Sequence, residues 1–253
     1  MIQSGYTAAQ GIKAQQQRVD ALANNIANIN TTGYKATKVD FKDALYVALQ
    51  DPSEPEGTDN LQRGSGVLIS GMSKVFKQGA YLETGRETDL YLDGEGFFAV
   101  QTPEGETYYT RDGSFSKSIE NGATYLVNAK GYYVLDVNGQ RIALQGDTME
   151  VSPEGQISAG ENTQPYATLQ IAVFPNQKGL TQVSDNMFAV SEASGNPARA
   201  GGTTKVLQEA LEGSNVDLAS ELTKLMRAQR AFSLSSRALT TADEMDGAAN
   251  TMR

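Results

Sequence analysis

The sequence predicts an α+β protein in which one long helix at each end of the chain flanks a central antiparallel β domain. Three observations predict it. Apolar residues recur at helical spacing near the N-terminus, they recur again near the C-terminus, and the residues between form short apolar runs separated by turn signals. A helix is stabilised in water mainly by burying one face, so both apolar faces need partners. We therefore expect a self-associating structural subunit rather than an enzyme.

The first helix is expected from about Ile2 to about Ile29. Its apolar residues recur in steps of three and four and include Ile12, Val19, Leu22 and Ile26. Asn24 and Asn28 lie one turn apart, where they can either hydrogen-bond to another helix or form a solvated face that ends in a turn. Gly33 suits the left-handed conformation that commonly ends a helix.

The middle of the chain is expected to be β-structure from residue 64 onward. Asp93-Gly94, Asp112-Gly113 and Asn138-Gly139 are dipeptides typical of tight hairpin turns, because both central residues of a type I′ turn need a positive φ. The expected strands are rich in β-branched and aromatic residues, and they cover residues 67–69, 90–92, 97–100, 107–110, 132–135, 141–144, 168–174 and 188–190. Their regular recurrence predicts a compact antiparallel barrel or sandwich, with residues 194–204 leading out of it.

The closing helix has the strongest start signal in the chain. Ser214 is expected as its N-cap, with Asp217 three residues later in the manner of a capping box. The apolar stripe of this helix contains Leu218, Leu222, Leu225, Gln229, Phe232 and Leu239.

These patterns together predict four consecutive regions. Residues 1–33 form an N-terminal assembly helix, and residues 34–75 form a connecting segment with weak helix-like spacing at 34–50 and an exposed acidic loop at 51–59. Residues 76–207 form the β-rich domain, and residues 208–253 form a C-terminal assembly helix.

The composition of the 253 residues narrows the possible functions. The formal net charge is −9, and Lys35, Lys38 and Lys42 are dispersed rather than clustered, which argues against nucleic-acid binding. The chain has no Cys and no His, which excludes disulfides, thiol nucleophiles, His-based triads and zinc sites built from these residues. No stretch reaches the roughly 20 apolar residues of a membrane span. The first residues also lack the pattern of a cleavable secretory signal, so we expect no membrane insertion.

A few acidic side chains are candidates for catalysis or metal binding. Asp89 and Asp93 flank a strand and resemble a glycosidase pair only in being two nearby carboxylates. Arg111 and Asp112 suggest an ion pair that steadies a hairpin or, alternatively, a subunit contact. The acidic loop at 51–59 lacks the fixed carboxylate spacing of a calcium site. We expect no catalytic residue, no cofactor and no metal.

Four motifs resemble those of one family. The run Asn24–Lys35 closely resembles the N-terminal signature of bacterial flagellar rod and hook proteins. Asp93–Val100 and Tyr109–Phe115 are similar to the central-domain motifs of that family. Leu211–Val216, followed by 226–230 and Phe232, resembles its C-terminal signature. The resemblance covers the whole chain in order. Within the family, the size and the run Thr-Arg-Asp-Gly-Ser-Phe are most like the distal rod members.

Two other members of the family are alternatives: Glu212–Val216 fits the proximal rod members at least as well, and a hook-related subunit is also possible. The resemblance implies a structural subunit of the periplasm-spanning basal-body rod, exported through the flagellar type III apparatus without a cleavable signal. Its implied partners are copies of itself in a helical polymer, other rod and hook subunits, and the ring proteins that surround the rod. The terminal helices should run antiparallel to each other.

The resemblance also extends the expected assembly interface beyond the apolar stripes. It adds residues of the two terminal signatures, namely Asn24, Asn25, Asn28, Asn30, Gly33, Ser214, Asn215, Val216, Met226 and Arg230. Two rival classes compete with this interpretation. One is a β-domain adaptor or adhesin that dimerises through its ends, and the other is a carboxylate-dependent hydrolase of cell-wall glycan using Asp89, Asp93 or Asp112.

Overall fold

The computed structural model describes residues 2–45, 47–48, 62–120, 122–146, 148–160, 164–184, 186–202 and 204–252. The chain divides into two compact units. Unit 1 contains residues 1–27, 37–74 and 217–253, and unit 2 contains residues 28–36 and 75–216. The predicted α+β class is confirmed, with one long helix near each end of the chain and antiparallel strands between. The acidic loop expected at 51–59 lies outside the described residues.

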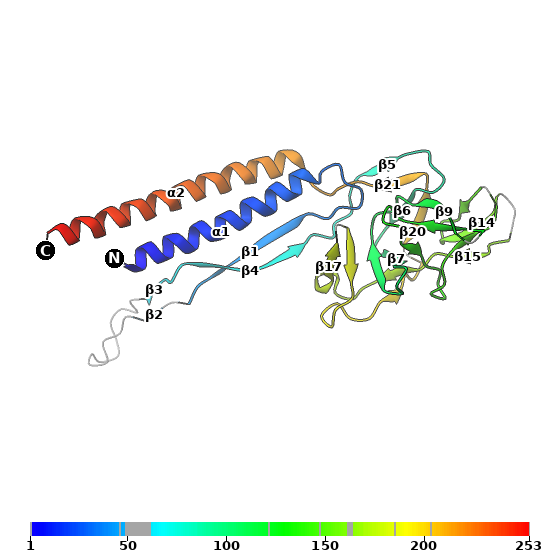
Figure 1. Cartoon of the computed structure of the whole chain (residues 1–253), viewed down its shortest axis with the longest axis horizontal. Helices are drawn as coiled ribbons and strands as arrows, with labels where there is room; N and C mark the ends of the chain where they lie inside the picture. The colour runs from blue at the N-terminus through cyan, green and yellow to red at the C-terminus, as the bar shows by residue number, and fades with distance from the viewer. Residues whose placement is uncertain are drawn as a thin grey trace. The chain divides into compact units, whose positions relative to one another are not determined.

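Unit 1 consists of two long helices and a β-hairpin (Figure 1). Its elements are α1 (Ile2–Ala27), β1 (Thr37–Asp43), β2 (Val47–Ala48), β3 (Gln62–Arg63), β4 (Val67–Lys74) and α2 (Leu218–Thr251). The two helices pack side by side and antiparallel, as expected. Gly5 of α1 lies against Leu239 of α2, whereas Asn25 at the other end of α1 hydrogen-bonds Glu221.

The N-cap of helix α2 lies three residues later than predicted. Asp217 is the N-cap, and its carboxylate accepts a hydrogen bond from the Ala219 amide over 3.2 Å. The prediction of Ser214 as N-cap is wrong, because its hydroxyl instead accepts from the Val216 amide over 3.3 Å in the segment before the helix. The carboxylate of an N-cap Asp accepts a hydrogen bond from an amide that has no partner within the helix. Its negative charge also interacts favourably with the positive, N-terminal end of the helix dipole.

Among the described residues of the segment with helix-like spacing, 34–45 and 47–48, there is no helix. Residues 37–43 form strand β1, which pairs antiparallel with β4, with a register shift between Asp40 and Phe41. The partner strand carries the expected β-branched run at 67–69. One face of the hairpin is covered, since the Arg18 guanidinium of α1 lies 5.5 Å from the centre of the Phe41 ring.

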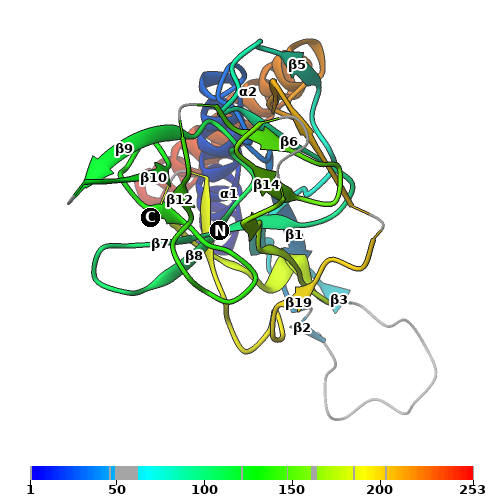
Figure 2. The ribbon, with the colours of Figure 1, turned by 90° about the vertical axis from the view of Figure 1, so that its right-hand side faces the viewer.

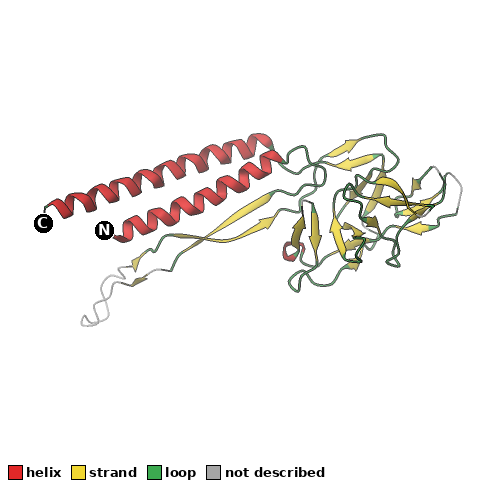
Figure 3. Ribbon diagram, in the orientation of Figure 1, coloured by secondary structure: helices red, strands yellow, loops and turns green. Residues whose placement is uncertain are grey.

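Unit 2 is built almost wholly of strands and loops (Figure 3). Its strands are β5 (Tyr81–Glu83), β6 (Leu90–Asp93), β7 (Phe97–Gln101), β8 (Thr107–Thr110), β9 (Ser116–Glu120), β10 (Ala123–Val127), β11 (Tyr133–Val134), β12 (Ala143–Leu144), β13 (Glu150–Val151), β14 (Gln156–Ser158), β15 (Ala167–Thr168), β16 (Ile171–Val173), β17 (Thr181–Ser184), β18 (Met187–Ala189), β19 (Ala198–Arg199), β20 (Lys205–Gln208) and β21 (Ala210–Glu212). A single 3₁₀ turn, η1, spans Gln177–Gly179.

The strands of unit 2 form open antiparallel sheets. The main path runs β12-β10-β11-β7-β8-β18-β17, with β16 also pairing β7 and β19, and with β9 pairing β10. Figure 2 shows β9, β10 and β12 of this path next to one another. A three-stranded sheet β13-β14-β15 and the pairs β20-β6 and β21-β5 complete the unit. The path does not close on itself among the described residues, so the expected barrel or sandwich is not confirmed.

Unit 2 continues as β-structure beyond the last strand predicted from the sequence. The segment expected to lead out contains β19, and two further strands follow it. Strand β20 pairs with β6, and β21 pairs with β5, so the chain returns to the first strands of the unit. Val206 and Ala210 are buried there, so the region expected to form the C-terminal assembly helix, residues 208–253, begins with a strand of unit 2.

The core of unit 2 has two apolar clusters. The larger one is centred on Phe98, Phe115 and Leu126, all fully buried. The smaller one contains Phe97 and Phe188, whose ring centres are 5.8 Å apart in an edge-to-face arrangement. Such pairs add roughly 0.5–1.5 kcal/mol beyond the apolar area that they bury. This core supports the strands that carry the charged group described next.

Candidate functional site

Three charged side chains are buried together in unit 2. Lys35 and Glu212 have side chains that are 1% exposed, and Arg111 is 4% exposed. Lys35 Nζ lies 2.5 Å from Glu212 Oε1, and Arg111 Nη1 lies 3.4 Å from Glu212 Oε2. We call these three residues the buried triad. They come from segments far apart in the sequence, and Lys35 and Glu212 are separated by 177 positions.

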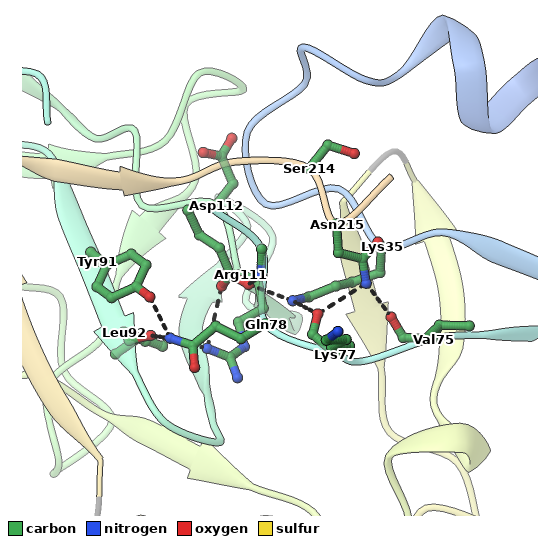
Figure 4. A network of polar contacts seen from close by, with 12 residues as sticks. Lys35, Val75, Lys77, Gln78, Tyr91, Leu92, Arg111, Asp112, Ser214 and Asn215 are labelled. Atoms are coloured by element: carbon green, nitrogen blue, oxygen red, sulfur yellow. Dashed lines mark hydrogen bonds and ion pairs between the residues drawn. The ribbon is translucent and has the colours of Figure 1, made fainter. Parts of the chain in front are cut away.

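Backbone groups make further hydrogen bonds with the buried triad. Lys35 Nζ donates to the Lys77 carbonyl over 2.9 Å, and Glu212 Oε1 accepts from the Gly79 amide over 2.8 Å. Arg111 Nη2 donates to the Gly94 carbonyl over 2.7 Å. Two cations around one carboxylate are thus held by carbonyl oxygens as well as by the ion pairs (Figure 4). A buried charge of this kind persists only when it is paired and hydrogen-bonded.

Asn215 holds the backbone beside the buried triad (Figure 4). Its side-chain amide donates to the carbonyls of Val75 and Lys77 over 2.7 and 2.9 Å, and its Oδ1 accepts from the Ala36 amide over 2.8 Å. One amide side chain therefore joins three segments that are distant in sequence. The predicted interface residue Asn215 thus makes its described contacts inside unit 2.

Burial sets the direction of the pKa shifts in the buried triad. Loss of hydration lowers the pKa of Lys35, and the neighbouring Glu212 carboxylate opposes that shift. Burial also lowers the pKa of Arg111, again against the attraction of Glu212. Because one carboxylate serves two cations, removal of that carboxylate should cost more than removal of either cation.

Gly33 is required where the N-terminal signature packs against the Arg-Asp-Gly segment. Its φ is +65°, so the predicted left-handed glycine is confirmed, although α1 ends earlier, at Ala27. Its amide donates to the Glu212 carbonyl over 2.7 Å. A Cβ placed on Gly33 would lie 2.5 Å from the Asp112 amide nitrogen, which is closer than real contacts allow.

We expect Gly33→Ala to destabilise unit 2 more than Gly85→Ala. Gly85 has nearly the same φ, +67°, but a Cβ there meets nothing within 4 Å. The control change should therefore cost only the left-handed strain of about 1–2 kcal/mol. Gly33→Ala should add about 1–3 kcal/mol of overpacking. Urea unfolding followed by tyrosine fluorescence measures both, and equal losses would show that the contact with Asp112 is unimportant.

The hairpin ion pair expected between Arg111 and Asp112 is wrong. Arg111 pairs with Glu212 instead, whereas Asp112 Oδ1 accepts from Thr32 Oγ1 over 2.8 Å and from the Ser114 amide over 3.1 Å. Asp112 therefore contacts the N-terminal signature, whereas Arg111 contacts the C-terminal signature through Glu212.

The helices of unit 1 carry the second candidate site, an exposed apolar face. On α2 the side chains of Leu218, Leu222 and Met226 follow one another at four-residue spacing. They are 43%, 41% and 53% exposed, while the neighbouring face of the helix is turned toward α1 and buries Ala228. We call these three residues the apolar face of α2. Their exposure follows from the pairing of only two helices, since a pair can bury only part of each apolar stripe.

The other predicted interface residues lie in several settings. Leu22 is buried, and a partly buried group consists of Ile12, Val19, Ile26, Leu225, Phe232 and Leu239. Exposed residues of the predicted set are Asn24, Asn30, Gln229 and Arg230, whereas Asn28, Ser214 and Val216 are partly buried in unit 2. Their role in assembly stays a prediction.

The asparagines near the end of α1 have different roles from those expected. Asn25 reaches the neighbouring helix, with its Nδ2 3.1 Å from Glu221 Oε2. Asn28 lies in the turn after the helix, where its Oδ1 accepts from Thr31 Oγ1 over 3.2 Å. The sequence showed three asparagines on a helix but not which one pointed inward.

The remaining candidates for chemistry gain no support. Asp89 is buried, and one of its carboxylate oxygens lies 4.0 Å from Arg86 Nε, while Asp93 is exposed at the end of β6. Within the described residues, no group of three or more acidic, His or Cys side chains is placed to hold a metal ion. In the same residues, neither helix combines the length and apolar character that a membrane crossing requires.

Comparison with known proteins identifies the class. Residues 207–252 match the family model of the C-terminal region of flagellar basal body rod FlgEFG proteins, and residues 91–159 match the D1 domain of flagellar hook protein FlgE/F/G. Residues 6–35 match the model of flagella basal body rod proteins. All three parts of the buried triad lie in or beside these matches, and together the matches define a flagellar rod and hook protein.

Full-length relatives define the family more closely. The chain is 36% identical to the flagellar basal-body rod protein FlgG of Buchnera aphidicola subsp. Baizongia pistaciae, over 97% of both chains. It is 37% identical to FlgG of Agrobacterium fabrum over 94% of both chains, and 36% identical to FlgG of Bacillus subtilis over 97% of both. The chain belongs to the FlgG family of flagellar basal-body rod proteins.

Proposed function

We propose that this chain, a structural subunit of the flagellar basal-body rod, assembles helically through its terminal helices into the torque-transmitting shaft. The apolar face of α2 is the observation that carries the proposal. Three large apolar side chains at regular spacing on a solvated helix leave area that a neighbouring copy can cover. Burial of these side chains against a neighbouring copy should stabilise the contact by roughly 25 cal/mol for each Å² of apolar surface removed from water.

The relatives support the setting of this assembly. Family membership and the names of the FlgG relatives support a place in the distal rod of the basal body. In this proposal other rod and hook subunits adjoin the polymer at its ends, ring proteins surround it, and the flagellar type III apparatus exports the chain without a cleavable signal. The predicted interface residues of both terminal signatures contribute to contacts between copies.

We expect Leu222→Asp to block polymerisation without unfolding either unit. A carboxylate at the centre of the apolar face of α2 would be desolvated in every subunit contact. Thr223→Asp is the matched control, because it places the same charge one residue along on an exposed position of a different face. Sedimentation velocity and circular dichroism should show an intact monomer for Leu222→Asp and normal open-ended polymer for Thr223→Asp.

The same measurement separates the rival functions. An adaptor that dimerises through its ends would give a fixed small oligomer at every protein concentration. Polymer formed by Leu222→Asp as readily as by the unaltered chain would remove the apolar face of α2 from the interface.

A further inference from the structure

Several small residues lie along the contact between α1 and α2. A Cβ on Gly11 would lie 3.5 Å from Ser235 Oγ, and one on Gly5 would lie 3.8 Å from the Leu239 side chain. Ala14, Ala21 and Ala228 are buried along the helices. Helices find their axial position when ridges of side chains fit into grooves, and small residues make both ridges and grooves shallow. Along these small residues, packing specifies the register of the pair only weakly.

A buried polar contact also joins α1 and α2. Asn25 is 1% exposed and Glu221 is 6% exposed, and Asn25 Nδ2 donates to Glu221 Oε2 over 3.1 Å. Asn25 also bonds the backbone of Thr37 in β1 in both directions, donating to its carbonyl over 2.9 Å and accepting from its amide over 2.8 Å. A single side chain thus fixes α1 against both the partner helix and the hairpin.

We propose that Asn25 and Glu221 are the register key of the terminal helices, the positioning contact that selects one axial alignment of α1 and α2. Sliding α2 by one turn in one direction would bring Leu225 to the position of Glu221 and leave the Asn25 amide without a carboxylate partner. Sliding in the other direction would bring Asp217, whose shorter carboxylate already accepts from the Ala219 amide as the N-cap of α2. A buried polar group that loses its partner is costly, whereas apolar contacts between small residues change little on sliding. Buried polar residues at single positions specify register in this manner in coiled coils.

The absence of cysteine from the sequence makes the register directly measurable. The Cβ position of Gly11 lies 3.9 Å from Ser235 Cβ, which is within the range that a disulfide requires. The pair Gly11→Cys with Ser235→Cys therefore reports the native register. Gly11→Cys with Ala231→Cys, or with Leu239→Cys, reports a slip of one turn in either direction. Oxidation of dilute monomer, read on non-reducing gels, gives the rate of each intramolecular cross-link.

With Asn25 and Glu221 intact, the native pair should cross-link at least about tenfold faster than either slipped pair, as expected for one hydrogen bond to a charged group. In the background Asn25→Leu with Glu221→Leu, the helices should stay paired by circular dichroism while this preference falls below about threefold. Glu221→Gln is the conservative control. It retains an acceptor for Asn25, so the native cross-link should keep its preference.

Two results would overturn the register key. One is an undiminished native preference in the Leu/Leu background, which would mean that chain connectivity alone sets the alignment. The other is loss of the preference in Glu221→Gln. The consequence for the polymer rests on the proposed function: slipped helices should give irregular polymer by electron microscopy. The cross-links are measured in the monomer, so they remain decisive even if the chain proves not to polymerise.

Discussion

Glu212→Gln should lower the free energy of unfolding of unit 2 by about 3–5 kcal/mol, the range found when a buried ion pair loses one partner. The change keeps the size of the side chain but leaves Lys35 and Arg111 buried without a counter-charge. Neither cation can recover by moving to water, since both are tied to backbone carbonyls. The amide also cannot accept as strongly from the Gly79 amide as the carboxylate does.

Urea unfolding followed by tyrosine fluorescence measures this loss, because the chain contains 11 Tyr and no Trp. Glu209→Gln is the matched control: it is the same substitution three positions earlier, at an exposed residue. The control should change stability by less than about 0.5 kcal/mol. If both variants lose equally little, the buried triad contributes no net stability.

Removal of residues 1–27 should abolish polymerisation while unit 2 stays folded. This deletion eliminates α1 but leaves residues 28–36, which belong to unit 2 and contain Lys35. Deletion of residues 1–35 should also abolish polymerisation and, in addition, destabilise unit 2, because it removes Lys35, the buried Tyr34 and the Gly33 amide that donates to the Glu212 carbonyl. The boundary between a harmless and a harmful truncation should therefore fall between the end of α1 and Lys35.

Sedimentation velocity and urea unfolding of the two truncated chains provide the comparison. Polymer formed by the chain that lacks residues 1–27 would contradict assembly through the terminal helices. Equal stability of unit 2 in both chains would instead contradict the role of Lys35 and leave the assembly proposal intact.

The sequence predicted the elements of the fold better than their arrangement. The expected strand at 97–100 is contained in β7, and the glycines of two predicted turns, Gly94 and Gly139, have positive φ. Gly113 differs from these turn glycines. The sequence predicts it in a tight turn, whereas the structure requires glycine there because a Cβ would lie 1.8 Å from the Leu90 carbonyl oxygen. A close approach between distant segments leaves no local signal, so sequence spacing could not reveal it.

The candidate site was predicted only in part, for a similar reason. The stripe at Leu218 and Leu222 was visible because helical periodicity is local. Lys35 was one of several dispersed lysines, and Glu212 was part of a signature without an assigned partner. Their pairing joins positions 177 residues apart, and only the folded chain brings such groups together. The contact of Asn25 with Glu221 likewise depends on how α1 is rotated about its axis, which the sequence alone does not show.

The hydrogen bonds among Gly33, Ala36, Glu212 and Asn215 have a consequence for how the chain opens. The stretch that follows the first helix and the stretch that precedes the last one are each other's partners, through Gly33 N to Glu212 O and Ala36 N to Asn215 Oδ1. Neither stretch can detach without breaking these hydrogen bonds to the other. These two stretches should therefore open together in one cooperative step, and their amides should exchange with solvent deuterium at a common rate.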